Sequence, residues 1–88
     1  MFSFNNFVIM HEYKLKYTTR EQALEDLVLK QVYAIEEDTY ILNEGALCVV
    51  EIGEIESIEG YHFDVRSAVE INFGDKEIFP NSPNHKFL

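Results

Sequence analysis

The chain has 88 residues, of which 47% are hydrophobic, and its formal net charge is −9 at pH 7. Folding at this length hides only about 60 to 65% of the unfolded chain's surface, so we expect one domain, residues 1–88, with a single modest core. The apolar content excludes intrinsic disorder. No run approaches the ~18 apolar residues of a membrane span, and residues 1–10 lack the basic start and cleavage site of a signal peptide.

The negative charge is concentrated in the middle third of the chain. Residues 31–59 hold eight acidic residues and no lysine or arginine, residues 1–30 are balanced, and residues 60–88 carry −1. Such a surface repels phosphate groups, which argues against direct binding of nucleic acid or an anionic membrane. Two interpretations stay open: the carboxylates attract a basic protein, or they keep a small domain soluble.

The first third predicts a strand followed by a helix. Residues 1–10 are an aromatic lead, which we expect to be loosely held. Residues 11–17 then alternate between aromatic or apolar and charged side chains, as in a strand with one solvent-exposed face. Thr18 with Glu21, or Thr19 with Gln22, has the form of a helix-capping pair, and apolar residues then recur at helical spacing. We predict one amphipathic helix over residues 19–31.

A helix this short is marginal in water by itself, so it has to lie on a sheet. Leu24 and Leu27 are its expected anchors. Short apolar segments at 32–35 and 40–42 follow, separated by an acidic turn at 36–38.

The longest apolar run, residues 46–58, is rich in β-branched side chains and predicts the central strand of the sheet. Its alternation slips by one residue at Gly53, which predicts a β-bulge there. The bulge would keep Ile52 and Ile55 facing the core while nearby carboxylates face water.

The last third predicts more strands and an irregular end. A loop is expected at 57–60, alternation predicts strands at 61–66 and 69–73, and residues 76–79 are a candidate edge strand. The tail, residues 80–88, has two prolines and cannot pair inside a sheet. We therefore expect an α+β domain: a mainly antiparallel sheet of four to six strands with one helix on one face.

No motif of an enzyme is present. His62 and Asp64 stand about 7 Å apart on one face of a strand, but two ligands without a third do not specify a metal site, and we expect a solvated strand face. Cys48 lies in the most apolar run, which favours core packing over a nucleophilic role. The glycines and serines form no phosphate-binding loop or nucleophile elbow. We expect no catalytic residue, no metal and no cofactor.

The carboxylates of the middle third are the candidate partner-binding residues. Neighbouring outward carboxylates on a strand stand about 6.6 Å apart, whereas duplex DNA carries one charge per about 1.7 Å, so imitation of DNA requires several segments to fold together. The candidates, with one aromatic residue, are Glu36, Glu37, Asp38, Glu44, Glu51, Glu54, Glu56 and Tyr40.

Three parts of the chain resemble small proteins of tailed phages and prophages that have no established activity. They are Tyr13-x-Leu-x-Tyr-Thr-Thr-x-x-x-Ala-Leu-x-Asp-Leu27, Gly60-Tyr-His-Phe-Asp-Val-Arg66 with Ile71-Asn-Phe-Gly, and Phe79-Pro-Asn-Ser-Pro-Asn-His-Lys-Phe87. The resemblance implies a phage-encoded accessory protein and transfers no catalytic residue. The long insertion expected before Gly60 in some relatives is missing here, so no loop-borne function is implied.

The leading hypothesis is a non-enzymatic protein-binding module of phage origin, acting in virion assembly or as a tail-associated accessory. Its partner would be a phage structural protein, and an edge strand could also pair with a second copy to give a homo-oligomer. The alternative is an acidic inhibitor of a host nucleic-acid-binding enzyme, with a basic host protein as partner. Either would act in the host cytoplasm or the virion.

Overall fold

The computed structural model describes residues 10–79, and the predicted lead up to residue 9 and the tail from residue 80 lie outside that part of the chain. The described residues form an α+β domain, which confirms the predicted fold class. The elements are β1 (His11–Tyr17), α1 (Arg20–Leu29), β2 (Tyr33–Glu36), β3 (Thr39–Leu42), β4 (Ala46–Ile55), β5 (Ile58–Ser67) and a short 3-10 helix η2 (Gly74–Lys76). Residues 10–79 contain no helix long and apolar enough to cross a membrane.

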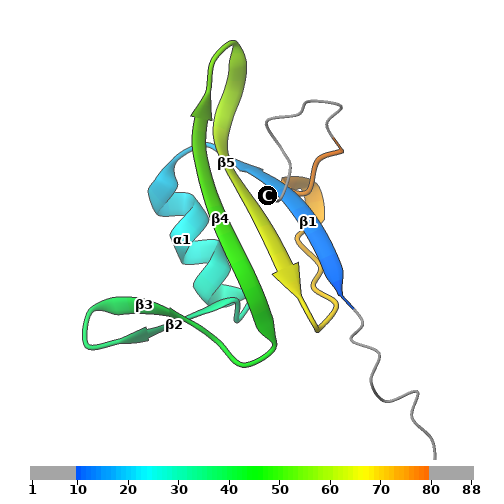
Figure 1. Ribbon diagram of the computed structural model, residues 1–88. Helices are drawn as coiled ribbons and strands as arrows, with labels where there is room; N and C mark the ends of the chain where they lie inside the picture. Colours follow the sequence, from blue (N-terminus) through cyan, green and yellow to red (C-terminus); the bar gives the residue numbers. More distant parts are fainter. Residues whose placement is uncertain (1–9, 80–88) are drawn as a thin grey trace, which may run out of the picture.

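The strands form two antiparallel sheets. One has the order β1-β5-β4, and the other is the β2-β3 hairpin, which projects beside one end of β4 (Figure 1). The prediction of 46–58 as the central strand is therefore wrong, because β5 lies in the middle and β4 at the edge. The predicted loop at 57–60 is a tight turn around Ser57, after which β5 begins at once. Leu47 of β4 is 43% exposed, as an edge position allows.

The predicted bulge in β4 is confirmed. The pairing with β5 shifts register between Glu51 and Gly53, and Gly53 has a φ of +83° that other residues rarely adopt. Ile55 is buried and Ile52 half-buried. The carboxylates of Glu54 and Glu56 are exposed, as the pattern predicts.

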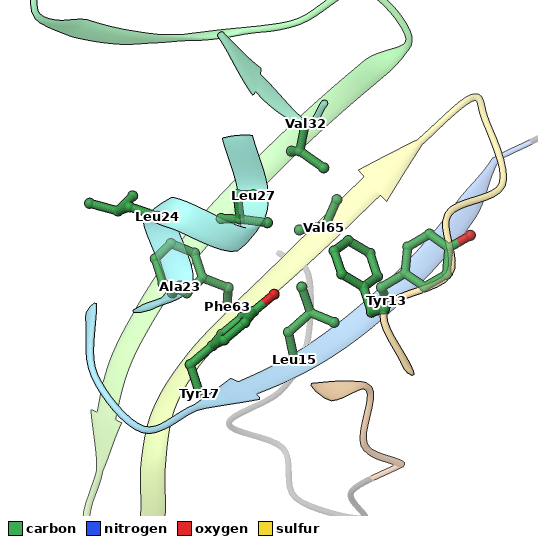
Figure 2. Close-up of a cluster of buried hydrophobic side chains, with 10 residues drawn as sticks. Tyr13, Leu15, Tyr17, Ala23, Leu24, Leu27, Val32, Phe63 and Val65 are labelled. Atoms are coloured by element: carbon green, nitrogen blue, oxygen red, sulfur yellow. The ribbon is translucent and has the colours of Figure 1, made fainter. Parts of the chain in front are cut away.

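Helix α1 packs on one face of the three-stranded sheet and closes the core (Figure 2). It begins at a capping residue, Thr19, whose hydroxyl accepts a hydrogen bond from the Gln22 N–H at 3.1 Å. The second of the two predicted capping pairs is therefore the one that forms. Leu27 is fully buried and Leu24 nearly so, which confirms both anchors. They meet side chains of β1 and β5 (Figure 2): Leu15, Tyr17, Phe63 and Val65.

The strand predicted at residues 69–73 does not form. Ser67 ends β5, because its hydroxyl bonds to both backbone groups of Val69 and competes with a continuing ladder. The segment then crosses back to the core, where the Ile71 N–H donates to the Tyr13 hydroxyl at 2.8 Å and Phe73 is buried. The predicted edge strand at 76–79 is reduced to η2 and one bridge.

The solvated strand face expected at His62 and Asp64 is also wrong, because both side chains are fully buried. They lie on the middle strand, opposite Lys16 and Lys14 of β1, on the face of the sheet away from α1. The His62 Nε2 atom lies 3.1 Å from the Glu59 carbonyl oxygen. Alternation alone could not show this burial, because it does not say which strand has neighbours on both sides.

Candidate protein-binding surface

The β2-β3 hairpin, residues 33–42, is an arm that leaves the body of the domain directly after α1 (Figure 1). Its root is fixed by Val32, which is fully buried. The Val32 N–H donates to the Leu27 carbonyl at 2.8 Å, and the Val32 carbonyl accepts from the Asn43 N–H at 2.9 Å. The arm is therefore held firmly at its base while most of its side chains stay in solvent.

One face of this arm is entirely apolar. The register pairs Tyr33 with Leu42 and Ile35 with Tyr40, and residues two apart on a strand share a face, so all four lie on the same side. Tyr33 packs against the core, and its ring centroid lies 5.6 Å from that of Tyr40. The exposed fractions of Ile35, Tyr40 and Leu42 are 58%, 43% and 45%. Gathered exposed apolar side chains of this kind mark interaction sites.

The tip of the arm carries three consecutive carboxylates, Glu36, Glu37 and Asp38, all exposed. Glu37 and Asp38 have φ values of 50° and 62°, the two positive angles of the tight hairpin turn that Asn-Gly normally fills. The left-handed conformation costs roughly 1 to 2 kcal/mol for an ordinary residue. The turn therefore keeps two acidic side chains at its tip although other residues would fit the backbone better.

Replacing Glu37 by Asn and Asp38 by Gly is expected to raise the free energy of unfolding by about 1 kcal/mol, because both new residues tolerate positive φ. In a domain of this size that raises Tm by about 4 to 8 °C, measured by thermal denaturation followed by circular dichroism. The matched control is Glu36→Gln with Glu44→Gln, which removes the same charge from positions without positive φ. An equal rise in both variants would show that charge, not backbone strain, is relieved.

The structure divides the predicted carboxylates between separate places. Glu36, Glu37 and Asp38 share the arm with Tyr40, and Glu44 lies in the turn at the arm's base. Glu54 and Glu56 lie at the other end of β4, in or beside the β4-β5 turn, which Figure 1 shows far from the arm. A ten-residue strand spans about 33 Å. Residues 10–79 therefore hold no single dense acidic surface of the kind that imitation of DNA requires.

Glu51 is engaged within the chain. Its carboxylate accepts from the Arg20 Nε at 2.7 Å and from the Tyr61 hydroxyl. The hydrogen bond from Arg20, followed by that from Tyr61, lowers the pKa of Glu51 below its ordinary value, and the hydrogen bond to Glu51 raises the pKa of Tyr61. Glu51 thus links the start of α1 to both strands of the β4-β5 hairpin, and it is less available to a partner than the sequence suggested.

Sequence reasoning selected Tyr40 and missed Ile35 and Leu42. Both were assigned to short apolar strands, and such strands are usually core. The signal that could have found them is the spacing: two four-residue strands joined by two residues form a hairpin, and its alternate positions are apolar on both strands.

Residues 10–79 hold no group of three or more His, Cys, Asp or Glu residues placed to bind a metal ion. A depression of about 410 Å³ lies beside Lys16, Tyr17, Glu59 and Lys76. Both of its lysines are engaged: Lys16 binds Glu59 at 3.3 Å, and the Lys76 Nζ lies 5.9 Å from the centroid of the Tyr17 ring. Cys48 is half-buried rather than in the core.

These residues define a small α+β domain with a projecting, partly apolar hairpin. Such architectures host many unrelated functions. No protein-family model, curated protein or solved structure matches the chain. Function is therefore argued from the chemistry of the surface.

Proposed function

We propose that this chain is a non-enzymatic protein-binding module that holds its partner on the β2-β3 arm. The observation that carries the proposal is the exposed apolar face of that arm, Ile35, Tyr40 and Leu42, continuous with the core through Tyr33. In line with the resemblance to phage proteins, the partner is a phage structural protein, and the module acts in virion assembly or at the tail. The setting is the host cytoplasm or the virion.

The partner's surface follows from the chemistry of the arm. Full burial of one large apolar side chain contributes about 1.5 to 3 kcal/mol, so three of them can anchor a complex. Tyrosine is a frequent hot-spot residue, and the ring of Tyr40 packs beside that of Tyr33. The carboxylates at the tip would steer a basic rim into place. The matching surface is an apolar pocket bordered by lysine or arginine.

The test is a comparison of two double variants in a pull-down from phage-infected host lysate, with and without virions. Ile35→Ser with Tyr40→Ser removes two exposed apolar side chains from the arm, and Leu29→Ser with Val69→Ser removes two from elsewhere. The affinity of the captured partner is then measured by titration calorimetry. We expect the arm variant to bind at least 30-fold more weakly, which corresponds to about 2 kcal/mol, and the control to bind as the unchanged chain does. Equal loss in both variants would refute the arm as the contact.

The alternative function, an acidic inhibitor of a host nucleic-acid-binding enzyme, is favoured by the three carboxylates at the tip of the arm. The division of the other carboxylates weighs against it. The salt dependence of the affinity distinguishes the two hypotheses. Binding of the carboxylates in a basic groove weakens steeply from low to moderate ionic strength, whereas binding through an apolar contact barely changes. Under the inhibitor hypothesis, changing Glu36 and Glu37 to Gln and Asp38 to Asn also abolishes binding.

A further inference from the structure

Strand β4 is the open edge of the three-stranded sheet. The opposite edge, β1, is partly closed, because the Ile78 N–H donates to the Lys14 carbonyl at 2.8 Å and Leu15 forms a bridge with Glu77. The backbone of residues 47–55 pairs with β5 on one side. Within residues 10–79, it makes no backbone hydrogen bond to any other part of the chain. The outer row of N–H and C=O groups of β4 is therefore a template for another strand.

The middle of this edge is regular enough to pair. From Cys48 to Glu51, β4 follows β5 residue by residue, and the register shifts lie on either side of that stretch. Val49 and Val50 within it are only half-buried, so an added strand would cover more apolar surface on both faces. The bulge at Gly53 ends the regular stretch, which limits an added strand to about five residues.

Charge indicates what kind of strand fits. Glu44 lies at one end of β4 and Glu54 and Glu56 at the other, all exposed, and no lysine or arginine occurs from residue 31 to 59. Glu51 is neutralised by Arg20 and does not count. A second copy of the chain, with its own net charge of −9, would bring the same carboxylates against these. An extended segment with lysine or arginine at its ends would meet opposite charge at both ends of the edge.

We propose that β4 binds an extended basic segment of the partner protein by strand addition, turning the three-stranded sheet into a four-stranded one. The inference rests on the proposed protein-binding function and adds how the partner is recognised. The arm leaves the domain beside one end of β4, on the side away from β5 (Figure 1), so one partner can reach both. Backbone pairing supplies specificity for an extended conformation, and the flanking carboxylates supply specificity for charge.

The first experiment titrates the ¹⁵N-labelled chain with an eight-residue peptide that has two lysines at each end and threonine alternating with valine in its four central positions. We expect chemical-shift changes and slowed amide exchange centred on residues 47–52. The same peptide methylated on its four central backbone nitrogens cannot donate hydrogen bonds there, and we expect it to bind at least tenfold more weakly. A glutamate-for-lysine peptide should not bind. Equal binding of either control peptide, changes confined to β1 or the arm, or no binding at millimolar peptide would each overturn the proposal.

Two pairs of charge-removing variants test whether the carboxylates at the ends of β4 attract the peptide or whether only the net charge of the chain does. Glu44→Gln with Glu54→Gln should weaken peptide binding severalfold, whereas Glu25→Gln with Asp75→Asn should not. The second pair makes an equal change of charge at exposed positions on α1 and on η2, which lies beside β1 at the opposite edge of the sheet. Equal weakening in both pairs would mean that only net charge matters. Dimerisation through β4, seen by analytical ultracentrifugation, would assign the edge to a second copy and overturn the proposal.

The arm variant Ile35→Ser with Tyr40→Ser distinguishes this inference from the proposed function. If it binds the peptide normally and loses the partner, both proposals stand. If the unchanged chain binds the peptide but partner capture does not depend on the arm, only the arm contact fails. If capture depends on the arm and the peptide does not bind, only strand addition fails.

Discussion

Replacing Leu27 by Asp is expected to unfold the domain. Leu27 is fully buried where α1 meets the sheet (Figure 2). Loss of such a leucine side chain costs about 2 to 5 kcal/mol, and burial of a carboxylate without a partner adds to this. The total free energy of unfolding of a small domain is only about 5 to 15 kcal/mol. Urea denaturation followed by circular dichroism should show a transition at far lower denaturant or none at all.

The control is the same substitution two residues further on. Leu29 belongs to the same helix but is 75% exposed, so Leu29→Asp removes no core contact. A negative charge in the last turn of a helix is unfavourable by about 0.3 to 1 kcal/mol, which sets the expected loss. If both variants lost the same free energy of unfolding, the loss would come from the helix propensity or the charge of aspartate. Burial of Leu27 would then not be what holds α1 on the sheet.

Much of the fold could be predicted because local pattern and local structure agree. The helix over residues 19–31 is observed at Arg20–Leu29, since capping by Thr19 and the spacing of Leu24 and Leu27 are local properties. The bulge at Gly53 was readable from the slip in alternation. The order of strands was not readable. An apolar run such as 46–58 shows that a strand has apolar side chains to bury, but it does not show whether other strands lie on one side of it or on both. The edge strand β4 was therefore predicted to be the central strand.

The candidate site could be predicted only in part, for the same reason. Tyr40 and the acidic tip were found from composition and charge. Ile35 and Leu42 look like core in the sequence, and only the projection of the arm leaves them in solvent. The pairing of Arg20 with Glu51 joins residues 31 positions apart, which no local pattern reveals. The solvated face expected at His62 and Asp64 was inferred from the lack of a third ligand beside them, which says nothing about their burial.

Replacement of Asp26, a half-buried residue beside the core, is expected to destabilise the domain. The Asp26 carboxylate accepts from the buried Tyr17 hydroxyl at 2.7 Å and from the Lys30 Nζ at 2.7 Å, and Lys30 also lies 5.9 Å from the centroid of the Phe73 ring. Asp26→Ala leaves a fully buried hydroxyl without its acceptor and should cost about 2 to 4 kcal/mol. Chemical denaturation at neutral pH measures the loss.

A double-mutant cycle with Tyr17→Phe assigns the cause of that loss. In the Tyr17→Phe background no hydroxyl is left to satisfy, so Asp26→Ala should cost about 1 to 3 kcal/mol less than in the unchanged chain. Strict additivity would mean that the Tyr17 bond contributes nothing and that Asp26 acts through Lys30 alone.

The pH dependence of stability tests the same bond independently. Burial, reinforced by the bond to Asp26, raises the pKa of Tyr17 above its ordinary value of 10.0. The unfolded chain therefore releases this proton first, and its contribution to stability is complete below pH 10 and is lost above it, by up to about 1.4 kcal/mol per pH unit. Because Tyr17→Phe has no such proton, its free energy of unfolding should fall less steeply between pH 10 and 11. Parallel profiles for the two chains would mean that the Tyr17 hydroxyl ionises as readily in the fold as in the unfolded chain, and they would contradict the bond to Asp26.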